Sequence, residues 1–396
     1  MNVERRTLVV ATALSVVRAE GDGVILTRKF MEGMKRYAEL WQGPVRCLAR
    51  EASSPSDNLD NAEVQLEQLP FELCLVPDQR KALEHQLQDA AVLLVAIGVY
   101  GSELAAAARQ LQVPVVLITE LSLRTRLQMM QLTTTNPLLR VRRAVWQLGQ
   151  EHHQRQMVRQ VAGVQCNGFP TFNTYRQLND NALLFFDSRH TQDTVRRAQT
   201  EQRLSTLVGA RPLQLAYSGR LIPIKGVDHL VPIAARLRKR GMDFRLRIFG
   251  AGVCEAGIRA QIAAHGLEAW VSLEGSLAFA EEWLPLMRRE IDLFLCCHRQ
   301  GDPSCTYLEA MACGVPVAGY ANEAVRGLLA LAEAGVATAT GDLAALVDAV
   351  IALDRDRPLL ARYSQRALDF AEEHCFEQTF RRRVDHVARL ASRAPL

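Results

Sequence analysis

The sequence predicts an α/β protein in which two doubly wound domains follow one another. Its 396 residues are about twice the length of a usual domain. Both halves alternate short apolar runs, typical of buried parallel strands, with amphipathic helical patterns. A polar stretch from about 191 to 211 separates the halves, so we expect domains at 1–205 and 206–373, followed by a helical segment at 374–396.

The composition is typical of a soluble globular chain with 48% hydrophobic and 23% charged residues. The net charge of +4 is too small to indicate a nucleic-acid partner. The nine cysteines form an odd set without a CxxC pair, which predicts free thiols in a reducing compartment. The apolar run Ala90–Ser102 is shorter than the roughly 20 residues of a membrane span, so we expect no transmembrane helix. Together with the thiols of a reducing compartment, this predicts a cytoplasmic protein.

The first apolar run, Thr7–Val17, follows Arg5 and Arg6 and has two interpretations: the core of a signal peptide, or a buried first strand. The odd number of cysteines and the absence of an Asn-x-Ser/Thr sequon favour the strand. In the rest of this half we expect helices over Val24–Trp41 and Glu103–Leu111, and strands over Val45–Ala49, Val92–Val99 and Val113–Thr119.

The second half shows the same alternation more clearly. A strand at Leu213–Ser218 precedes a helix over Asp228–Arg240, and Gly241 marks the end of that helix. The chain ends in a helical region, Pro358–Leu390, which is broken near His374. Further strands are predicted over Phe244–Ile248, Val271–Leu273, Ile291–Cys296 and Val315–Ala318.

A segment with the features of a ligand-binding helix follows the strand Ile291–Cys296. Asp302 is a good N-cap and Gly314 ends the element, so we expect a helix over 303–313. Ligands of open α/β sheets bind at the carboxyl edge, where the first turn of a helix offers unpaired N–H groups to an anion such as diphosphate. These N–H groups belong to Ser304, Cys305 and Thr306.

Glu309 lies in the apolar part of this expected helix, where a buried carboxylate needs a partner. Two partners are open: the vicinal hydroxyls of a ribose, or a nearby arginine in a structural ion pair. For Asp302, capping of the helix and contact with a sugar are both open.

The turn Ser218–Gly226, directly after a strand, contains two cations, Arg220 and Lys225. At the carboxyl edge of the sheet they could neutralise a diphosphate, Arg220 as a planar fork and Lys225 as a point charge. The alternative is that both are solvated surface cations.

The chain lacks the P-loop, HExxH and GxSxG signatures, and Gly250-x-Gly252 lacks the third glycine of the dinucleotide fingerprint because Glu255 stands there. His152 and His153 are interpreted as a surface pair, since no other ligand is spaced to complete a metal site. We therefore expect no metal.

Together these motifs resemble the retaining glycosyltransferases of the GT-B fold, family four, also described as glycosyl transferases group 1. The resemblance covers about 205–375, whereas the first half matches only in architecture. It implies two Rossmann-like domains facing a cleft, with the acceptor in the first, the donor in the second and the C-terminal helix crossing back to the first. The matching motifs are Ser218–Leu221 with Lys225–Gly226, Phe249–Gly252, Leu273–Gly275 and Leu308–Val317.

The resemblance also implies roles for single residues. Arg220 and Lys225 become ligands of the diphosphate leaving group, and Glu309 becomes the ribose ligand. The implied function is retaining transfer of a sugar from a UDP- or GDP-linked donor to a saccharide or lipid-linked acceptor, with no cofactor and no metal. Donor-side glycines in this scheme are Gly219, Gly250, Gly21 and Gly23.

The sequence departs from the family at two places. The family usually has two glutamates separated by seven residues, and Gly301 stands at the first position. A histidine often follows an N-terminal strand, but Tyr100 and Glu120 stand near those strand ends here; either has an acceptor-side role, or it packs in the core or caps a helix. The departures keep open a non-catalytic sugar-nucleotide-binding relative, and a GT-B epimerase or phosphorylase.

Two further regions have open interpretations. Leu121–Gln160 is rich in arginine, and Leu138, Val141, Val145 and Leu148 share one helical face. That face packs in the core, or it makes peripheral contact with the inner face of a membrane near a lipid-linked acceptor. Loops predicted to face the cleft, where acceptor contact and ordinary turn chemistry are both open, are Cys166–Thr171 and Phe186–Arg189.

Overall fold

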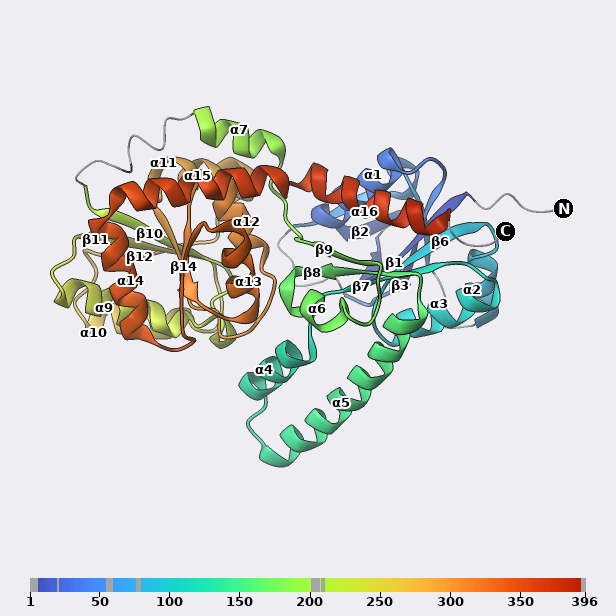
Figure 1. The fold of residues 1–396 in the computed structure, drawn as a ribbon, viewed down its shortest axis with the longest axis horizontal. Helices are drawn as coiled ribbons and strands as arrows, with labels where there is room; N and C mark the ends of the chain where they lie inside the picture. Colours follow the sequence, from blue (N-terminus) through green and yellow to red (C-terminus); the bar gives the residue numbers. More distant parts are fainter. Residues whose placement is uncertain are drawn as a thin grey trace.

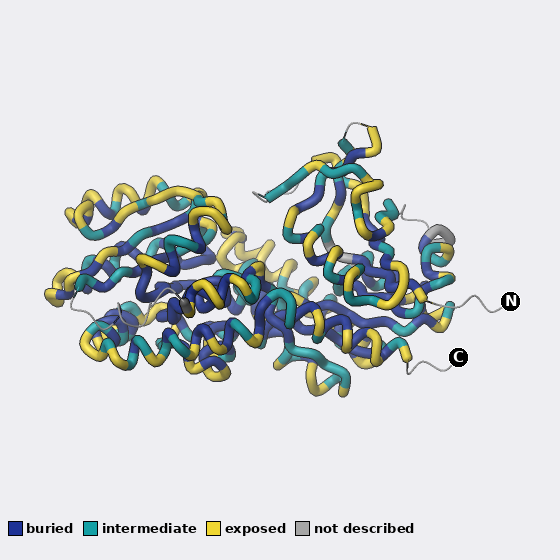
Figure 2. Tube along the Cα trace, turned by 90° about the horizontal axis from the view of Figure 1, so that it is seen from above, coloured by how far each residue is buried: buried dark blue, intermediate teal, exposed yellow. Residues whose placement is uncertain are grey.

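Two α/β halves lie side by side in the computed structural model (Figure 1), which describes residues 6–19, 21–54, 60–75, 80–200, 207 and 211–392. Each half has a mainly or wholly parallel sheet covered by helices on both faces. In Figure 2 the buried segments lie inside each half, and exposed residues lie on the outer helices. The predicted architecture of two doubly wound domains is confirmed.

The first half is built on seven parallel strands in the order β5-β3-β1-β6-β7-β8-β9. The apolar run that begins at Thr7 is the central strand β1, and Leu8, Val9 and Val10 are fully buried. Strands buried on both faces need such continuous apolar runs. The strands are β1 (Thr7–Arg18), β3 (Val45–Glu51), β5 (Glu72–Leu75), β6 (Ala90–Ala96), β7 (Val115–Thr119), β8 (Gly163–Asn167) and β9 (Ala182–Phe185).

An antiparallel extension corrects one prediction. The end of β1 pairs with β2 (Gly23–Thr27), which pairs with β4 (Asn61–Gln65), so the helix expected from Val24 begins later, at Arg28. The β-branched residues of β2 favour a strand once these two partners are present. Thr27 then caps the helix, because its hydroxyl accepts a 3.2 Å hydrogen bond from the N–H of Phe30.

Helices cover both faces of the first sheet. One face packs against α1 and the C-terminal helix, and the other against α3, α6 and the end of α5. Gly168 has a φ of +71°, which allows α6 to begin directly after β8, so the predicted loop Cys166–Thr171 is largely helical. The helical elements of this half are α1 (Arg28–Leu40), η1 (Leu66–Gln68), α2 (Arg80–Gln86), α3 (Val99–Gln110), α4 (Leu123–Thr133), α5 (Pro137–Gln160) and α6 (Gly168–Tyr175). The next helix, α7 (Gln192–Thr200), packs instead against the second half, where Val195 and Ala198 join the apolar core.

The second half has six parallel strands in the order β12-β11-β10-β13-β14-β15, the order of the dinucleotide-binding fold. The order reverses between β10 and β13, and ligands of such sheets bind at the carboxyl ends beside that point. The strands are β10 (Leu213–Ser218), β11 (Phe244–Phe249), β12 (Val271–Gly275), β13 (Leu293–Cys296), β14 (Val317–Tyr320) and β15 (Gly335–Thr338).

Two α-helices of the second half begin about two residues later than predicted. The helix expected at Asp228 begins with a 3-10 turn, and the one expected at 303 begins at Cys305 with Ser304, not Asp302, as N-cap. The Asp302 carboxylate is instead bound by Lys225. The elements are η2 (Pro223–Lys225), η3 (Val227–His229), α9 (Leu230–Lys239), α10 (Glu255–Ala264), η4 (Phe279–Trp283), α11 (Leu284–Glu290), α12 (Cys305–Ala312), α13 (Glu323–Ala332), α14 (Leu343–Arg355), α15 (Arg357–Glu373) and α16 (Phe376–Ala391).

The last two helices connect the halves. The chain breaks between α15 and α16, near His374 as expected, and α16 extends over the first half (Figure 1), where it contacts α1, β6 and β9. Tyr37 of α1 meets Phe380 edge to face with ring centroids 5.1 Å apart. Arg383 donates from Nε to Oε1 of the buried Gln165 at 2.8 Å, which fastens α16 to β8.

Helices α4 and α5 form a hairpin that projects from the first half (Figure 1). The helical face of Leu138, Val141, Val145 and Leu148 is exposed over more than half of each side chain, so the core-packed interpretation is wrong for this part of α5. The face stays open because the projecting turns of α5 lie beyond the sheet that buries its last turns. Within the described ranges, no helix combines the length and apolarity needed to cross a bilayer.

Candidate active site between the two halves

The carboxyl edges of the two sheets meet around the segment that precedes α12. The carbonyl of Gly301 accepts a hydrogen bond from the hydroxyl of Thr125 on α4 at 3.1 Å. The N–H of Gly301 donates to Oε1 of Gln128 on the same helix, also at 3.1 Å. The first half therefore contacts the loop that follows β13, where a ligand of the second sheet is expected.

A cavity of about 570 Å³ opens in the first half at the carboxyl ends of its strands. This volume is in the range of small-molecule sites. Its walls combine apolar side chains, such as Met34 and Phe185, with charged and amide groups. The charged and amide side chains are Lys29, Glu120, Arg126, Gln154, Asn167, Asp187 and Arg383.

The two predicted acceptor-side residues occupy different places. Glu120 follows β7 and lines the cavity, where solvent still reaches it. Partial burial raises the pKa of the Glu120 carboxyl, and the negative charge of Asp187 raises it further. Tyr100 is the second residue of α3 and lies outside the cavity lining, with the guanidinium of Arg50 4.9 Å from its ring centroid.

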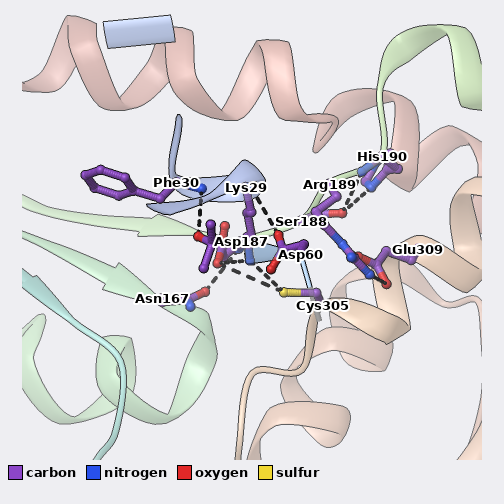
Figure 3. A network of polar contacts seen from close by, with 11 residues as sticks. Lys29, Phe30, Asp60, Asn167, Asp187, Ser188, Arg189, His190, Cys305 and Glu309 are labelled. Atoms are coloured by element: carbon purple, nitrogen blue, oxygen red, sulfur yellow. Dashed lines mark hydrogen bonds and ion pairs between the residues drawn. The ribbon is translucent and has the colours of Figure 1, made fainter. Parts of the chain in front are cut away.

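Lys29, in the first turn of α1, bridges the two halves (Figure 3). Its Nζ lies 2.5 Å from Oδ2 of Asp187, which follows β9, and 3.2 Å from Sγ of Cys305 at the start of α12. Burial lowers the pKa of Lys29, but its contacts with Cys305 and Asp187 outweigh burial and raise the pKa above its ordinary value. Lys29 is therefore a fixed positive charge between cavity and second sheet.

Cys305 is a thiol rather than a thiolate. Burial raises its pKa to about 12 despite the lowering effect of Lys29. All nine cysteines are free, as predicted. Among the residues that the structure describes, no three His, Cys, Asp or Glu side chains are grouped to hold a metal ion.

Glu309 is 3% exposed and pairs with an arginine from outside the second sheet. Arg189, in the loop after β9, donates from Nε at 2.9 Å and from Nη2 at 3.4 Å to the two carboxylate oxygens (Figure 3). Its guanidinium also lies 3.9 Å from the ring centroid of Phe279. The arginine alternative for Glu309 is thus realised in this structure.

Lys225 is 6% exposed, so the interpretation as a solvated surface cation is wrong for this residue. Its Nζ lies 2.7 Å from Oδ2 of Asp302, and the same oxygen accepts a 3.0 Å hydrogen bond from Nε2 of Gln300. Gly226 next to it has a φ of +65°, and a Cβ there would lie 1.9 Å from the carbonyl oxygen of Cys297. Glycine is required for this turn.

Arg220 is exposed at the same edge, beside a tightly packed pair of loops. A Cβ on Gly250, whose φ is +121°, would lie 2.0 Å from the carbonyl oxygen of Gly219. This close approach requires glycine at position 250. Arg220 and Lys225 therefore follow one strand, with Lys225 buried and Arg220 open to solvent.

The first turn of α12 offers fewer donors than predicted. The N–H of Ser304 donates to the carbonyl of Asp302 at 2.8 Å. The N–H groups of Cys305 and Thr306 have no hydrogen bond to any described residue and lie at the positive end of the helix. Gly21, with a φ of +64°, lies in the turn between β1 and β2, and Gly23 is the first residue of β2. Neither glycine makes a hydrogen bond to the described residues of the second half.

Gly301, where the resemblance predicts a glutamate, faces the other half of the molecule. A Cβ added there would lie 3.3 Å from both Cβ of Glu323 and Oγ1 of Thr125, tighter than most such contacts. A longer side chain at this position would therefore push against α4.

The sequence predicts the loop that contains Asp187 and Arg189, but it predicts no partner for either residue and does not single out Lys29. The end of the preceding strand predicts the loop. The signal for Lys29 is its place in the first turn of a helix. The partners of Asp187 and Arg189, however, lie 158 and 120 residues away along the chain.

Parts of the chain match a known family and several known proteins. The family described as glycosyl transferases group 1 matches residues 198–370. An alpha-D-kanosaminyltransferase of Streptomyces kanamyceticus is 28% identical over 187 residues, 47% of each chain. A lipopolysaccharide core biosynthesis mannosyltransferase of Rhizobium meliloti is 36% identical over 159 residues, 38% of this chain and 44% of that protein. The chain thus spans less than half the length of these curated relatives.

Among solved structures, HepE of Anabaena in complex with UDP superposes with a TM-score of 0.66 at 14% identity, over 97% of this chain and 99% of that one. This likeness extends through both halves and shows the fold. Residues 198–370 therefore belong to the glycosyl transferases group 1 family, in a chain that has the two-domain GT-B fold.

Proposed function

We propose that this chain transfers a sugar from a nucleoside-diphosphate sugar to a saccharide or lipid-linked acceptor in the synthesis of a polysaccharide or glycoconjugate. The observation that carries the proposal is that Lys225 and Glu309, two buried charges in the family-matching segment, lie at the sheet edge that faces the first half. The names of the relatives, a kanosaminyltransferase and a mannosyltransferase, and the UDP in the HepE structure support it.

In this proposal the donor binds at the carboxyl edge of the second sheet. Its diphosphate lies between Lys225, Arg220 and the free N–H groups at the start of α12. Its ribose hydroxyls donate to Glu309 and replace Arg189, whose side chain is 38% exposed and can move into solvent. The positive charge that the diphosphate requires comes from these side chains and the helix terminus.

The acceptor binds in the cavity of the first half, so residues 1–205 form the acceptor domain, 206–373 the donor domain and 374–396 the segment that crosses back. The acceptor oxygen attacks the anomeric carbon on the face that the diphosphate leaves, so the configuration is retained. The bond to the phosphate oxygen breaks, and the departing phosphate takes the proton of the acceptor hydroxyl. Lys225 stabilises the charge that develops on this phosphate in a water-poor cleft.

A second candidate function is a sugar-nucleotide-binding protein that does not transfer. Gly301 favours it, because the family carboxylate is missing there and α4 occupies the space that it would need. The two candidates share donor binding and differ in turnover.

The first experiment is a thermal-shift screen of the purified chain with UDP, GDP, ADP, TDP and CMP and their common sugar conjugates. A ligand at 100 times its Kd adds about 2.7 kcal/mol to stability, which raises the melting temperature measurably. We expect one nucleotide to stabilise selectively and Glu309→Gln to abolish the shift. Glu333→Gln is the matched control, since that glutamate is 62% exposed.

Turnover is then measured as release of the nucleoside diphosphate from the selected donor, and the anomer formed is read by NMR. Release with retention supports transfer, and binding without release on any saccharide acceptor supports the second candidate. No shift with any nucleotide refutes both.

A further inference from the structure

The projecting part of α5 exposes a group of large apolar side chains. Isolated exposed apolar residues are ordinary, but a contiguous group indicates an interaction surface. We define the α5 patch as Leu138, Val141, Val145, Trp146 and Leu148, whose exposure lies between 54% and 80%.

The surroundings of the α5 patch carry charge of one sign. Between residues 121 and 150 the sequence has five arginines and no aspartate or glutamate. Arg124 and Arg142 are exposed and make no hydrogen bond or ion pair with a described residue. Arg142 lies on α5 among the patch residues, so the patch is apolar and carries open positive charge. Arg124 lies instead on the face of α4 that contains Gln128, the partner of Gly301.

The hairpin has a defined shape at its tip. The side chain of Arg143 donates to Oγ1 of Thr134 at 2.5 Å, and the guanidinium of Arg140 donates to the carbonyls of Thr134 and, at 3.1 Å, Gln131. Two arginines thus close the turn between α4 and α5.

The base of the hairpin is anchored in the first half. Glu151, which is buried, binds Arg126 of α4 at 2.6 Å and Arg155 at 2.7 Å, and it accepts a 3.2 Å hydrogen bond from the hydroxyl of Tyr175. The patch is therefore held away from the domain by an ordered support (Figure 1).

We propose that the α5 patch docks on a lipid bilayer that contains anionic lipids. Its apolar side chains enter the interface, Trp146 lies at headgroup level, and the arginines pair with lipid phosphates. A second copy of the chain fits less well. Two such helices would bring arginine against arginine, with no carboxylate between 121 and 150 to neutralise them.

Membrane docking does not depend on the proposed function, but it bears on the acceptor class that the proposed function would use. Gln154 lines the cavity and lies eight residues along α5 from Trp146, about 12 Å at the rise of an α-helix. A bilayer beneath the patch therefore lies close to the proposed acceptor cavity. If that function holds, lipid-linked saccharides are the favoured acceptor class.

The test is co-sedimentation of the full chain with vesicles of phosphatidylcholine and phosphatidylglycerol in equal parts, and with phosphatidylcholine alone, at low salt. We expect binding to the anionic vesicles and at least a tenfold loss in Val145→Ser/Trp146→Ser. Arg142→Gln should lose about fivefold, because one arginine contributes about 1 kcal/mol near an anionic surface.

Val253→Ser/Leu331→Ser is the matched control, since these apolar residues of the second half are 82% and 53% exposed. It should bind like the unaltered chain. All variants change exposed side chains, and a thermal melt checks that each is folded. Tryptophan emission should shift to the blue with anionic vesicles, and Trp146→Phe should remove that shift.

Absence of sedimentation at low salt would overturn the proposal, as would binding that the patch variant leaves unchanged. A dimer in light scattering that the patch variant dissociates, without vesicle binding, would assign the surface to a second copy instead. None of these readouts requires transferase activity, so a failed docking proposal is distinguishable from a failed functional one.

Discussion

Replacing Arg189 by glutamine should destabilise the chain, because it leaves the buried carboxylate of Glu309 without its charged partner. The carboxylate is 3% exposed and is held by two nitrogens at 2.9 and 3.4 Å. Removing one partner of a buried ion pair costs about 3–5 kcal/mol. Since the Arg189 side chain is 38% exposed, solvent screens part of the interaction, and we expect a loss of about 1–2 kcal/mol.

For a domain of about 200 residues, a loss of about 1–2 kcal/mol lowers the melting temperature by about 2 to 8 °C. The assay is calorimetry of Arg189→Gln, Glu309→Gln and the double variant. The double variant should lose less than the sum of the two single losses, by about 0.5–2 kcal/mol. Arg240→Gln is the control, because Arg240 and its partner Asp348 are both more than half exposed and the change should cost under about 0.5 kcal/mol.

Additive losses in the double variant would refute the inference that Arg189 and Glu309 interact in the folded chain. Equal losses in Arg189→Gln and Arg240→Gln would refute the inference that burial strengthens the pair.

Lys225→Ala should lower turnover at least tenfold because the departing phosphate loses its buried cation. The variant should also lose stability, because the Asp302 carboxylate loses its lysine partner; adding Asp302→Asn should restore stability but not turnover. Normal turnover in Lys225→Ala would contradict the assignment. Burial lowers the pKa of His386 to about 4, below about 6.5 in the unfolded chain, so the unfolded chain binds the extra proton in this window. Stability should therefore fall as the pH drops from 6.5 towards 4, and His386→Gln should make that fall shallower in urea titrations; the remainder comes from other buried histidines such as His374, whose pKa burial lowers to about 3. A slope unchanged by His386→Gln would argue against the burial of His386. Gly301→Glu should lower stability by about 1–3 kcal/mol through contact with Thr125 and leave turnover unimproved; a gain in turnover at unchanged stability would show that the missing carboxylate limits catalysis.

Much of the fold could be predicted because strand and helix periods are local properties. The apolar runs that begin at Leu8 and Leu213 became central strands of the two sheets. Val24–Thr27 could not be predicted as a strand, since its partner β4 lies more than 30 residues further along the chain. The exposed face of α5 has the same helical pattern as a core helix, and only the absence of a neighbouring element tells the two apart.

Local residue patterns are enough to predict the alternation of strands and helices, the glycine turns around Gly226 and Gly250, and the segment that contains Lys225 and Glu309. These depend on backbone preferences and on neighbours within a few residues. Three features depend on the folded molecule instead: Arg189 meets Glu309, Lys29 contacts both Asp187 and Cys305, and the α5 patch faces outward. Such contacts join segments more than 100 residues apart, and their strength depends on burial, which the packing of the two halves creates.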